Sequence, residues 1–334
     1  MKIAVLHNED TFASAQFEHL RTHLHGQELF SWAPDSAPPA NDFTILLVAG
    51  KIERAQLESQ PQLQLLQTTS AGYEGLDIEA ASSLGIWASN APSGETGNAE
   101  SVGEWAVALM LAASRDLGLV RAGKSERVAL ALAQKTVCIV GFGGIGRALA
   151  DRLRPFRVHL IVVDEHPEHA PADAEAYAAD DLKRAVGNAD YVVLCVPATP
   201  DNENLVDATV LNAMKREAIL INVARGSLVD EEALLAALQA GRVRAAGLDV
   251  LRHEPLSPDD PLVRTPHAFV TPHIAGPTDH TIEGTTKYVA GVIDALEHGR
   301  RWGSLLNDPP HPRRPLADSE KAPFSGPRLH PSLR

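Results

Sequence analysis

The sequence is poor in cysteine and aromatic residues and lacks any apolar run long enough to span a bilayer. Its 334 residues include two cysteines, and aromatic residues make up 5% of the chain. Cys138 and Cys195 lie inside apolar, strand-like runs, where a buried, reduced thiol is usual, so we expect neither to have a redox role. The opening residues MKIAVLH are typical of a first strand rather than of a signal peptide. These features predict a cytoplasmic protein with no membrane partner.

Positive charge is also scarce. Lysine and arginine number 30 against 43 aspartate and glutamate residues, which gives a formal net charge of −13. Such a chain repels phosphate backbones and anionic lipid head groups, so nucleic acid is not an expected partner. A small anionic ligand is still compatible with this charge, because a site can be locally positive in an acidic protein. Lys51, Arg54 and Arg225 are candidates for that local field.

The length and the pattern of apolar runs predict two modest α/β domains. In the first hundred residues, short apolar runs alternate with polar or helical stretches; these runs are KIAVL, FTILLVA, LQLLQT and GIWAS. Six further strands are expected near residues 137–141, 159–164, 191–196, 218–223, 245–250 and 268–271. With helices between them, these strands form one doubly wound parallel sheet.

Helices and a tail complete the expected layout. A helix should begin near Asn98, and the periodic run TIEGTTKYVAGVIDALEHG should form another near the C-terminus. The segment WGSLLN after that helix resembles a return segment. From about Asp308 the chain is rich in proline, arginine and histidine and has little apolar content, so we expect this tail to be mobile.

A glycine-rich fingerprint, GFGGIG, follows the apolar run TVCIV and precedes the helical run RALADRL. In this strand–turn–helix context Gly141 permits the turn, Gly143 lets the backbone approach a pyrophosphate, and Gly146 allows close helix packing. The next strand ends at Asp164, where a carboxylate can accept from an adenosine ribose 2′-hydroxyl and repel a 2′-phosphate. Because no arginine follows in DEHPEH, NAD is favoured over NADP. The alternative is a glycine turn beside an unrelated surface carboxylate.

Three polar residues follow the last three expected strands: Arg225, Glu254 and His273. The carboxyl ends of parallel strands share one edge of the sheet, where ligands bind, so these side chains should lie near the fingerprint. A guanidinium can hold a carboxylate through two hydrogen bonds. Histidine can donate a proton near neutral pH to an oxygen that gains charge during hydride transfer, and a neighbouring carboxylate favours the protonated ring. The three residues together predict a dehydrogenase.

Each of the three has a simpler explanation. Arg225 could cap a turn or pair with Asp230, Glu254 could be an ordinary solvated carboxylate, and His273 could be a structural histidine between prolines. Their joint placement at one edge of a dinucleotide-binding sheet favours catalysis.

Several segments resemble, in order, the D-isomer-specific 2-hydroxyacid dehydrogenases; they are SAGYEGLD, GNAESVGEWAVALMLAASR, VGFGGIGR, NVARGSLVDEEAL, GLDVLRHEPL and TPHIAG. The resemblance covers most of residues 1–306. It implies a Rossmann nucleotide domain, residues 98–288, inserted into a flavodoxin-like substrate domain made of residues 1–97 and 289–334. It also implies a homodimer that pairs through the helix after Asn98.

The resemblance further implies roles for individual residues. Arg225 would bind the substrate carboxylate and the reacting oxygen, His273 would be the acid/base, Glu254 would be its partner, and the amides of Ala71 and Gly72 would hold the other side of the carboxylate. No metal site is expected. The contacts to the NAD cofactor would come from Gly141, Gly143, Gly144, Ile145, Gly146, Asp164, Pro197, Thr199, Val223, Ala224, Asp249 and Gly276. Asp249 could instead be only a structural hydrogen-bond acceptor.

The chain departs from the family pattern at three places. Residues 116–134 are shorter than usual and lack a tryptophan segment, Tyr73 and Glu74 occupy the substrate loop, and Pro277 removes a backbone donor after the HIAG turn. If it points inward, Glu74 would disfavour a substrate with a second anionic group.

The predicted reaction is therefore hydride transfer between NAD(H) and a small or apolar 2-keto or D-2-hydroxy acid. The alternatives are a non-enzymatic NAD-sensing protein of the same fold, or a relative acting on phosphite or formate.

Overall fold

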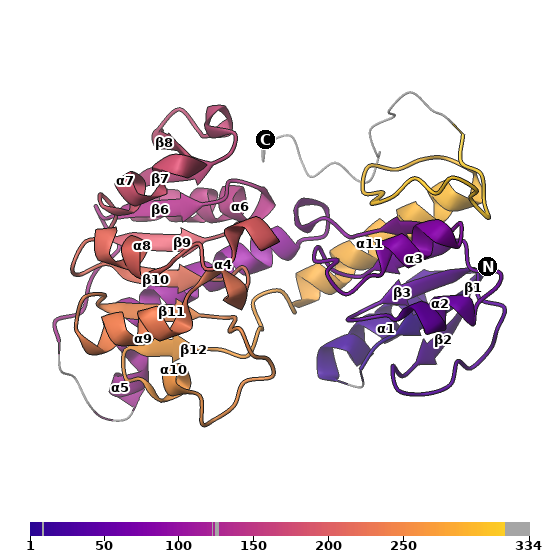
Figure 1. Cartoon of the computed structure of the whole chain (residues 1–334), viewed down its shortest axis with the longest axis horizontal. Coiled ribbons are helices and arrows are strands. Elements are labelled where there is room, and N and C mark those ends of the chain that lie inside the picture. The colour runs from indigo at the N-terminus through magenta and orange to yellow at the C-terminus, as the bar shows by residue number, and fades with distance from the viewer. Residues whose placement is uncertain (9, 122, 124–126, 318–334) are drawn as a thin grey trace. The chain divides into compact units, whose positions relative to one another are not determined.

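The computed structural model describes residues 1–8, 10–121, 123 and 127–317, which form two compact α/β units (Figure 1). The first unit joins Met1–Asn98 to the chain from Pro277 onward, and the second is Ala99–Gly276. Each unit has its own parallel sheet, which confirms the predicted fold class.

The second crossing between the units lies at Gly276 and Pro277, whereas the sequence placed it at 288/289. The predicted boundary would divide α11 (Asp279–Glu297), which is one uninterrupted helix. All of α11 belongs to the first unit, where its side chains Tyr288, Val289 and Val292 are buried in the core. Near its start, a Cβ on Gly284 would lie 2.3 Å from the carbonyl oxygen of Thr96, so this turn packs against the same unit.

The sheet of the first unit has the strand order β2-β1-β3-β4-β5, which is the flavodoxin-like order. The strands are β1 (Lys2–Leu6), β2 (Glu28–Trp32), β3 (Ile45–Val48), β4 (Leu65–Thr68) and β5 (Trp87–Ser89). Helices α1 (Thr11–His23) and α11 pack on one face, and α2 (Arg54–Glu58) and α3 (Ile78–Ser83) on the other. Because both faces are covered, the central strands are continuous apolar runs. Beyond α11, Leu305 forms an antiparallel bridge with Ser89, as expected of a returning segment.

The sheet of the second unit has the order β12-β11-β10-β9-β6-β7-β8 (Figure 1). Its strands, all paired in parallel, are β6 (Thr136–Val140), β7 (His159–Asp164), β8 (Ala174–Ala178), β9 (Tyr191–Leu194), β10 (Ile219–Asn222), β11 (Ala245–Leu248) and β12 (Ala268–Val270). The order reverses between β6 and β9. In open α/β sheets the ligand crevice lies outside the carboxyl ends of the strands at such a reversal.

Helices cover both faces of this second sheet. On one face α4 (Asn98–Ser114) and α6 (Gly144–Leu153) enclose a core that includes Leu109, Ile139 and Leu149. On the other face lie α7 (Leu182–Val186), α8 (Ala208–Ala213), α9 (Glu231–Gln239) and α10 (Pro261–Arg264). Helix α5 (Leu117–Arg121) follows α4. Cys138 and Cys195 are free and buried, as predicted, and burial raises the pKa of each thiol to about 12.

Two strands were not predicted from the sequence, and both lie at the edge of a sheet. Strand β2 (ELFSW) borders the first sheet and β8 (AEAYA) borders the second. Each has only one fully buried side chain, Trp32 and Tyr177 respectively. An edge strand is less enclosed than a central one, so it does not need the continuous apolar run by which the central strands were found.

The prediction that the chain does not pack from about Asp308 is wrong for residues 308–317. The Arg313 guanidinium donates to the carbonyl oxygens of Gln60 (2.8 Å) and Leu63 (3.1 Å), and burial lowers its pKa. The indole of Trp87 donates to the carbonyl oxygen of Arg314 at 2.8 Å. This segment is held by hydrogen bonds to backbone carbonyls, which its low apolar content did not reveal. The rest of the predicted tail, residues 318–334, lies outside the described residues.

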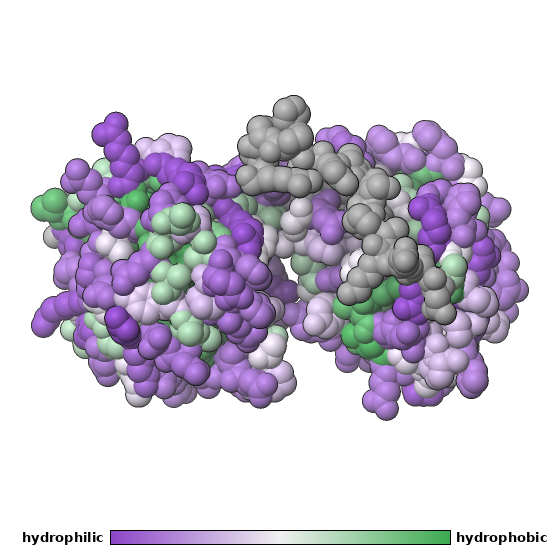
Figure 2. All heavy atoms as spheres, turned by 90° about the horizontal axis from the view of Figure 1, so that it is seen from above, coloured by the Kyte–Doolittle hydropathy of each residue, from purple (hydrophilic) through white to green (hydrophobic). Residues whose placement is uncertain are grey.

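Hydrophilic residues predominate on the face of the two units drawn in Figure 2. The large apolar side chains that are exposed include Leu117, Val120 and Val128, which lie in or beside the shortened segment 116–134. Residues 122 and 124–126 of that segment are outside the described part of the chain, so the homodimer stays a prediction.

No helix among the described residues combines the length and apolar character needed to cross a membrane.

We expect Arg313→Ala to lower the free energy of unfolding by about 1–3 kcal/mol, because the buried carbonyl groups of Gln60 and Leu63 each lose one donor. Chemical denaturation of the purified protein measures the change. Arg314→Ala is the matched control, since its guanidinium contacts one carbonyl, that of Glu297, and should cost less. Equal stability of Arg313→Ala and wild type would contradict the anchoring role.

Candidate active site

The carboxyl edge of the second sheet carries most of the predicted site residues. Gly141 follows β6, Asp164 ends β7, Pro197 follows β9, and Arg225 follows β10. Glu254 and His273 lie in the loops after β11 and β12. Because these strands are all parallel, the structure places these residues along the same edge, as the sequence predicted.

The fingerprint forms a tight turn between β6 and α6. Gly141 has φ +94°, and a Cβ there would lie 2.7 Å from the backbone nitrogen of Val196. A Cβ on Gly146 would lie 2.2 Å from the carbonyl oxygen of Gly141, so α6 can approach the strand only with glycine here. Both observations match the roles expected of these glycines.

Gly143, the second glycine of the fingerprint, faces open space. A Cβ built on Gly143 meets no heavy atom within 4 Å. Gly143 is the N-cap of α6, and Gly144 and Ile145 are the first two residues of the helix. Backbone amides at a helix N-terminus attract anions. The residues present therefore fit the pyrophosphate of a dinucleotide.

Asp164 is held in place by two backbone amides. Its Oδ2 accepts from the Phe142 amide at 2.6 Å and its Oδ1 accepts from the His166 amide at 2.9 Å. Partial burial tends to raise the pKa of this carboxyl, but the two hydrogen bonds, with the nearby His166 and His169 rings, outweigh burial and lower it. A negative charge therefore lies directly beside the fingerprint.

His273 and Glu254 form a hydrogen-bonded pair. His273 Nδ1 lies 2.8 Å from Glu254 Oε2, and the side chains are 47% and 34% exposed, so the pair can be reached from solvent. The other oxygen of Glu254 accepts from the Leu251 amide at 3.3 Å. When Nδ1–H donates to the carboxylate, Nε2 is the ring nitrogen that can exchange a proton with another molecule.

The turn that presents His273 is organised by Asp249. This side chain is 1% exposed. Its two oxygens accept hydrogen bonds from the side chains of Trp105 (3.1 Å) and Thr271 (2.6 Å) and from the amides of Ile274 and Ala275 (3.0 Å each). The His273 amide donates to the Asp249 carbonyl at 2.8 Å, and His273 has φ +53°. Asp249 thus fills the structural role that the sequence left open; its cofactor contact stays a prediction.

Arg225 begins a loop that closely approaches the loop of Glu254. A Cβ on Gly226, the next residue, would lie 2.0 Å from the carbonyl carbon of Leu251. The Asn222 side chain donates to the Arg225 carbonyl at 2.8 Å, and Arg225 Nη1 donates to the Ala224 carbonyl at 2.8 Å. Glycine at position 226 therefore lets the arginine loop and the glutamate loop pack against each other.

The other predicted cofactor residues of this unit lie in loops after β9, β10 and β12. The Asn202 side chain fixes the turn from Pro197 to Thr199: it donates to the Pro197 carbonyl and accepts from the Thr199 amide, each at 2.8 Å. Val223 and Ala224 are buried directly after β10, and Gly276 is the last residue of the unit.

Ala71 and Gly72 belong to the first unit and follow β4 at the carboxyl edge of its sheet. Asn90 donates to the Ala71 carbonyl at 2.8 Å and Ser70 donates to the Gly72 carbonyl at 3.0 Å. Within the described residues, the amides of Ala71 and Gly72 donate no hydrogen bond to the chain. They can therefore serve as donors to a ligand.

Four residues that hold the site in place were not predicted from the sequence. None of them is charged; they are Asn222, Gly226, Trp105 and Thr271. Gly226 was the one with a local signal, since it directly follows Arg225. Trp105 is far from Asp249 in sequence, so only folding reveals their contact. In the part of the chain that the structure describes, no three histidine, cysteine, aspartate or glutamate side chains are grouped to hold a metal ion.

The chain is similar to known proteins over most of its length. A model of the D-isomer specific 2-hydroxyacid dehydrogenase NAD binding domain matches residues 107–275. The chain is 31% identical over 305 residues to a glyoxylate reductase of Thermococcus litoralis. This match covers 84% of the chain and 90% of the relative. It is 36% identical over 255 residues to a D-3-phosphoglycerate dehydrogenase of Mycobacterium leprae, but this match spans 73% of the chain and only 47% of the relative.

A solved structure is also similar. The NADPH-dependent glyoxylate/hydroxypyruvate reductase of Sinorhizobium meliloti has 27% sequence identity and a TM-score of 0.78, with 92% of this chain and 98% of that chain covered. The family model, the relatives and the fold agree, and the chain belongs to the D-isomer specific 2-hydroxyacid dehydrogenase family.

Proposed function

We propose that this protein is an NAD-dependent D-2-hydroxyacid dehydrogenase that interconverts a small 2-keto acid and the corresponding D-2-hydroxy acid. The observation that carries the proposal is the 2.8 Å pair of His273 and Glu254. This pair lies on the same sheet edge as the dinucleotide fingerprint and Arg225. A binding protein that only senses a dinucleotide needs the fingerprint but has no use for a proton donor beside it.

In this mechanism His273 is the general acid and base. Nδ1 donates to Glu254, which orients the ring. During reduction Nε2 gives its proton to the oxygen of the keto group, and during oxidation it takes the proton back. A nicotinamide cofactor, when bound, would supply or receive the hydride. Arg225 binds the carboxylate of the acid. The backbone amides of Ala71 and Gly72 donate further hydrogen bonds to the same carboxylate.

NAD is the proposed cofactor. Asp164 keeps a charged carboxylate beside the fingerprint, where it can accept from a ribose hydroxyl and repel a 2′-phosphate. The NADPH-dependent relative from Sinorhizobium meliloti makes this preference a point to test. In its favour, the DEHPEH segment has no arginine to pair with a phosphate.

A glyoxylate- or hydroxypyruvate-like acid, or an apolar 2-keto acid, is the proposed substrate. The glyoxylate reductase match extends over 90% of the relative's length, whereas the phosphoglycerate dehydrogenase match covers 47%. Glu74 lies two residues after Gly72 in the proposed substrate loop. If the Glu74 side chain points toward the bound acid, its carboxylate disfavours a phosphorylated acid by like-charge repulsion. We further propose that the protein is cytoplasmic and acts as a homodimer that pairs through α4.

The reaction is tested by following NADH oxidation with glyoxylate, hydroxypyruvate, pyruvate, and branched and aromatic 2-keto acids. We expect turnover with at least one of them. Formate and phosphite, tested with NAD⁺, distinguish a relative that acts on another small anion. Tight NADH binding with no turnover on the whole panel would instead favour a sensor.

We expect His273→Gln to lower kcat for the best substrate by about 100- to 10,000-fold, because the residue supplies a proton in the transition state. The dissociation constant of NADH, measured by fluorescence titration, should change far less. His298→Gln is the matched control, since this exposed histidine lies at the end of α11 and contacts Asp294. Equal losses of kcat and of NADH affinity would make His273 a cofactor-pocket residue instead.

We expect Asp164→Asn to shift the NADH-to-NADPH ratio of kcat/KM toward NADPH by roughly 10- to 100-fold, because the repulsive charge is removed. Asparagine preserves the side-chain size and one acceptor oxygen. Glu165→Gln, at the adjacent exposed carboxylate, is the control and should leave the ratio nearly unchanged. An unchanged ratio in Asp164→Asn would remove the basis for the NAD preference.

A further inference from the structure

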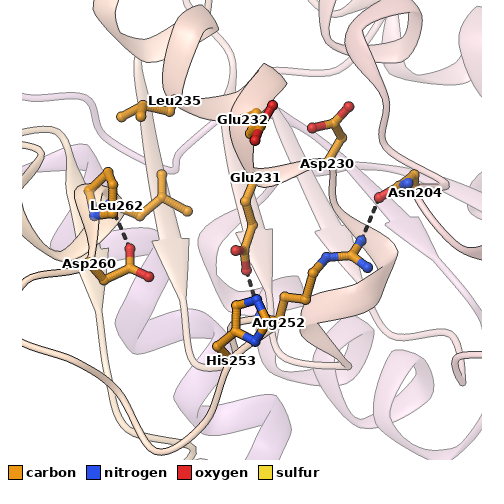
Figure 3. A pocket seen from close by; sticks show the side chains of 10 residues that line it. Asn204, Asp230, Glu231, Glu232, Leu235, Arg252, His253, Asp260 and Leu262 are labelled. Atoms are coloured by element: carbon orange, nitrogen blue, oxygen red, sulfur yellow. Dashed lines mark hydrogen bonds between the residues drawn. The ribbon is translucent and has the colours of Figure 1, made fainter.

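Arg252 connects three loops at the carboxyl edge of the second sheet, and Figure 3 shows its bond to one of them, at Asn204. It lies two residues before Glu254, in the loop after β11. Its Nη1 donates to Glu203 Oε1 at 2.7 Å and its Nη2 donates to Asn204 Oδ1 at 2.5 Å, in the loop after β9. Nη2 also lies 3.3 Å and 3.5 Å from the carbonyl oxygens of Ser227 and Val229, in the loop after β10. A single guanidinium thus touches two loops other than its own.

The backbone of Arg252 is bound to the same neighbourhood. Its amide donates to Glu231 Oε1 at 2.6 Å, at the start of α9. A Cβ on Gly226 would lie 2.3 Å from the Arg252 nitrogen, so the arginine loop is already in contact with this residue. Arg252 is therefore held through both its main chain and its side chain to the loop that begins at Arg225.

Each of the three loops carries residues assigned to the proposed reaction. Arg225 begins the loop after β10, Glu254 lies in the loop after β11, and Pro197 and Thr199 lie in the loop after β9. Catalysis depends on the separation of such groups, and a displacement of about 1 Å can cost on the order of 100-fold in rate. We propose that Arg252 is a positioning residue: it holds the Glu254 loop against the loops after β9 and β10 and so sets the position of Glu254 relative to Arg225. This inference rests on the proposed function.

An isolated surface ion pair would not do this. Arg252 and Glu203 are 30% and 57% exposed, and exposed pairs of that kind contribute little. Arg252 differs from an isolated pair, because its guanidinium also contacts a side-chain amide in the loop after β9 and two backbone carbonyls in the loop after β10. A planar guanidinium with five donors suits this arrangement, whereas the single ammonium of lysine does not.

A surface pocket of about 420 Å³ lies beside Arg252. Its lining includes four acidic side chains: Asp230, Glu231, Glu232 and Asp260 (Figure 3). Truncation of Arg252 would open its site to this pocket. A small planar cation could then enter from solvent, which makes chemical rescue by guanidinium ion a suitable test.

The experiment compares Arg252→Ala and Arg252→Lys with Arg264→Ala. Arg264 is a matched control because it lines a neighbouring pocket and its guanidinium, among the described residues, donates to Pro258 and Asp259, which are close to it in sequence. We expect Arg252→Ala to lower kcat on the best 2-keto acid by about 10- to 100-fold. NADH affinity should change by less than about three-fold, because Asn202 fixes the Pro197–Thr199 turn without Arg252. Arg252→Lys should recover only part of the loss, and Arg264→Ala should resemble wild type.

Guanidinium ion at low millimolar concentration, compared with sodium ion at equal ionic strength, should restore part of the kcat of Arg252→Ala. A purely structural defect would not respond in this way. Wild-type kcat in Arg252→Ala, or a loss matched by the control and insensitive to guanidinium, would overturn the inference while leaving the proposed function intact.

If wild type turns over no acid on the panel, the proposed function fails and positioning is tested by hydrogen–deuterium exchange. Faster exchange around residues 203–206 and 251–255 in Arg252→Ala, and not in Arg264→Ala, would support the inference. Unchanged exchange would overturn it.

Discussion

The buried carboxylate of Asp249 is the constraint on which the geometry of the candidate site depends. A carboxylate removed from water is stable only when its oxygens accept hydrogen bonds. At Asp249 the donors come from α4 through Trp105, from Thr271, and from the two amides that follow His273. Meeting the hydrogen-bonding needs of one side chain therefore fixes the turn after β12. His273 is held in a left-handed conformation by that turn, at a position from which Nδ1 reaches Glu254.

Close backbone contacts supply the second constraint. Gly226 and Gly146 each leave room for a neighbouring main chain that a Cβ would strike at 2.0 Å and 2.2 Å respectively. The first contact brings the Arg225 loop to the loop before Glu254, and the second brings α6 to the fingerprint turn. Gly143 differs, because it leaves space toward solvent in which a ligand can lie. The same residue type thus serves packing at two positions and access at a third.

The order and type of the central elements could be predicted because their physical signals are local. Buried parallel strands need continuous apolar runs, and a glycine turn between a strand and a helix has a specific spacing. The edge strands β2 and β8 were missed because they are less enclosed and need no such run. The packing of residues 308–317 was missed for a related reason: Arg313 anchors this segment to backbone carbonyls, and hydrogen bonds of that kind leave no apolar pattern.

The sequence by itself determined the residue types at the sheet edge and their order along the chain. Arginine, glutamate and histidine after three successive strands could be read without coordinates, because parallel strands bring their carboxyl ends to one edge. Only the tertiary structure decided how these residues are supported. The supporting contacts join residues that are distant in the chain: Trp105 with Asp249, Gly226 with Leu251, and Arg252 with Glu203. No local pattern encodes such contacts, since they exist only once the helices and loops have packed.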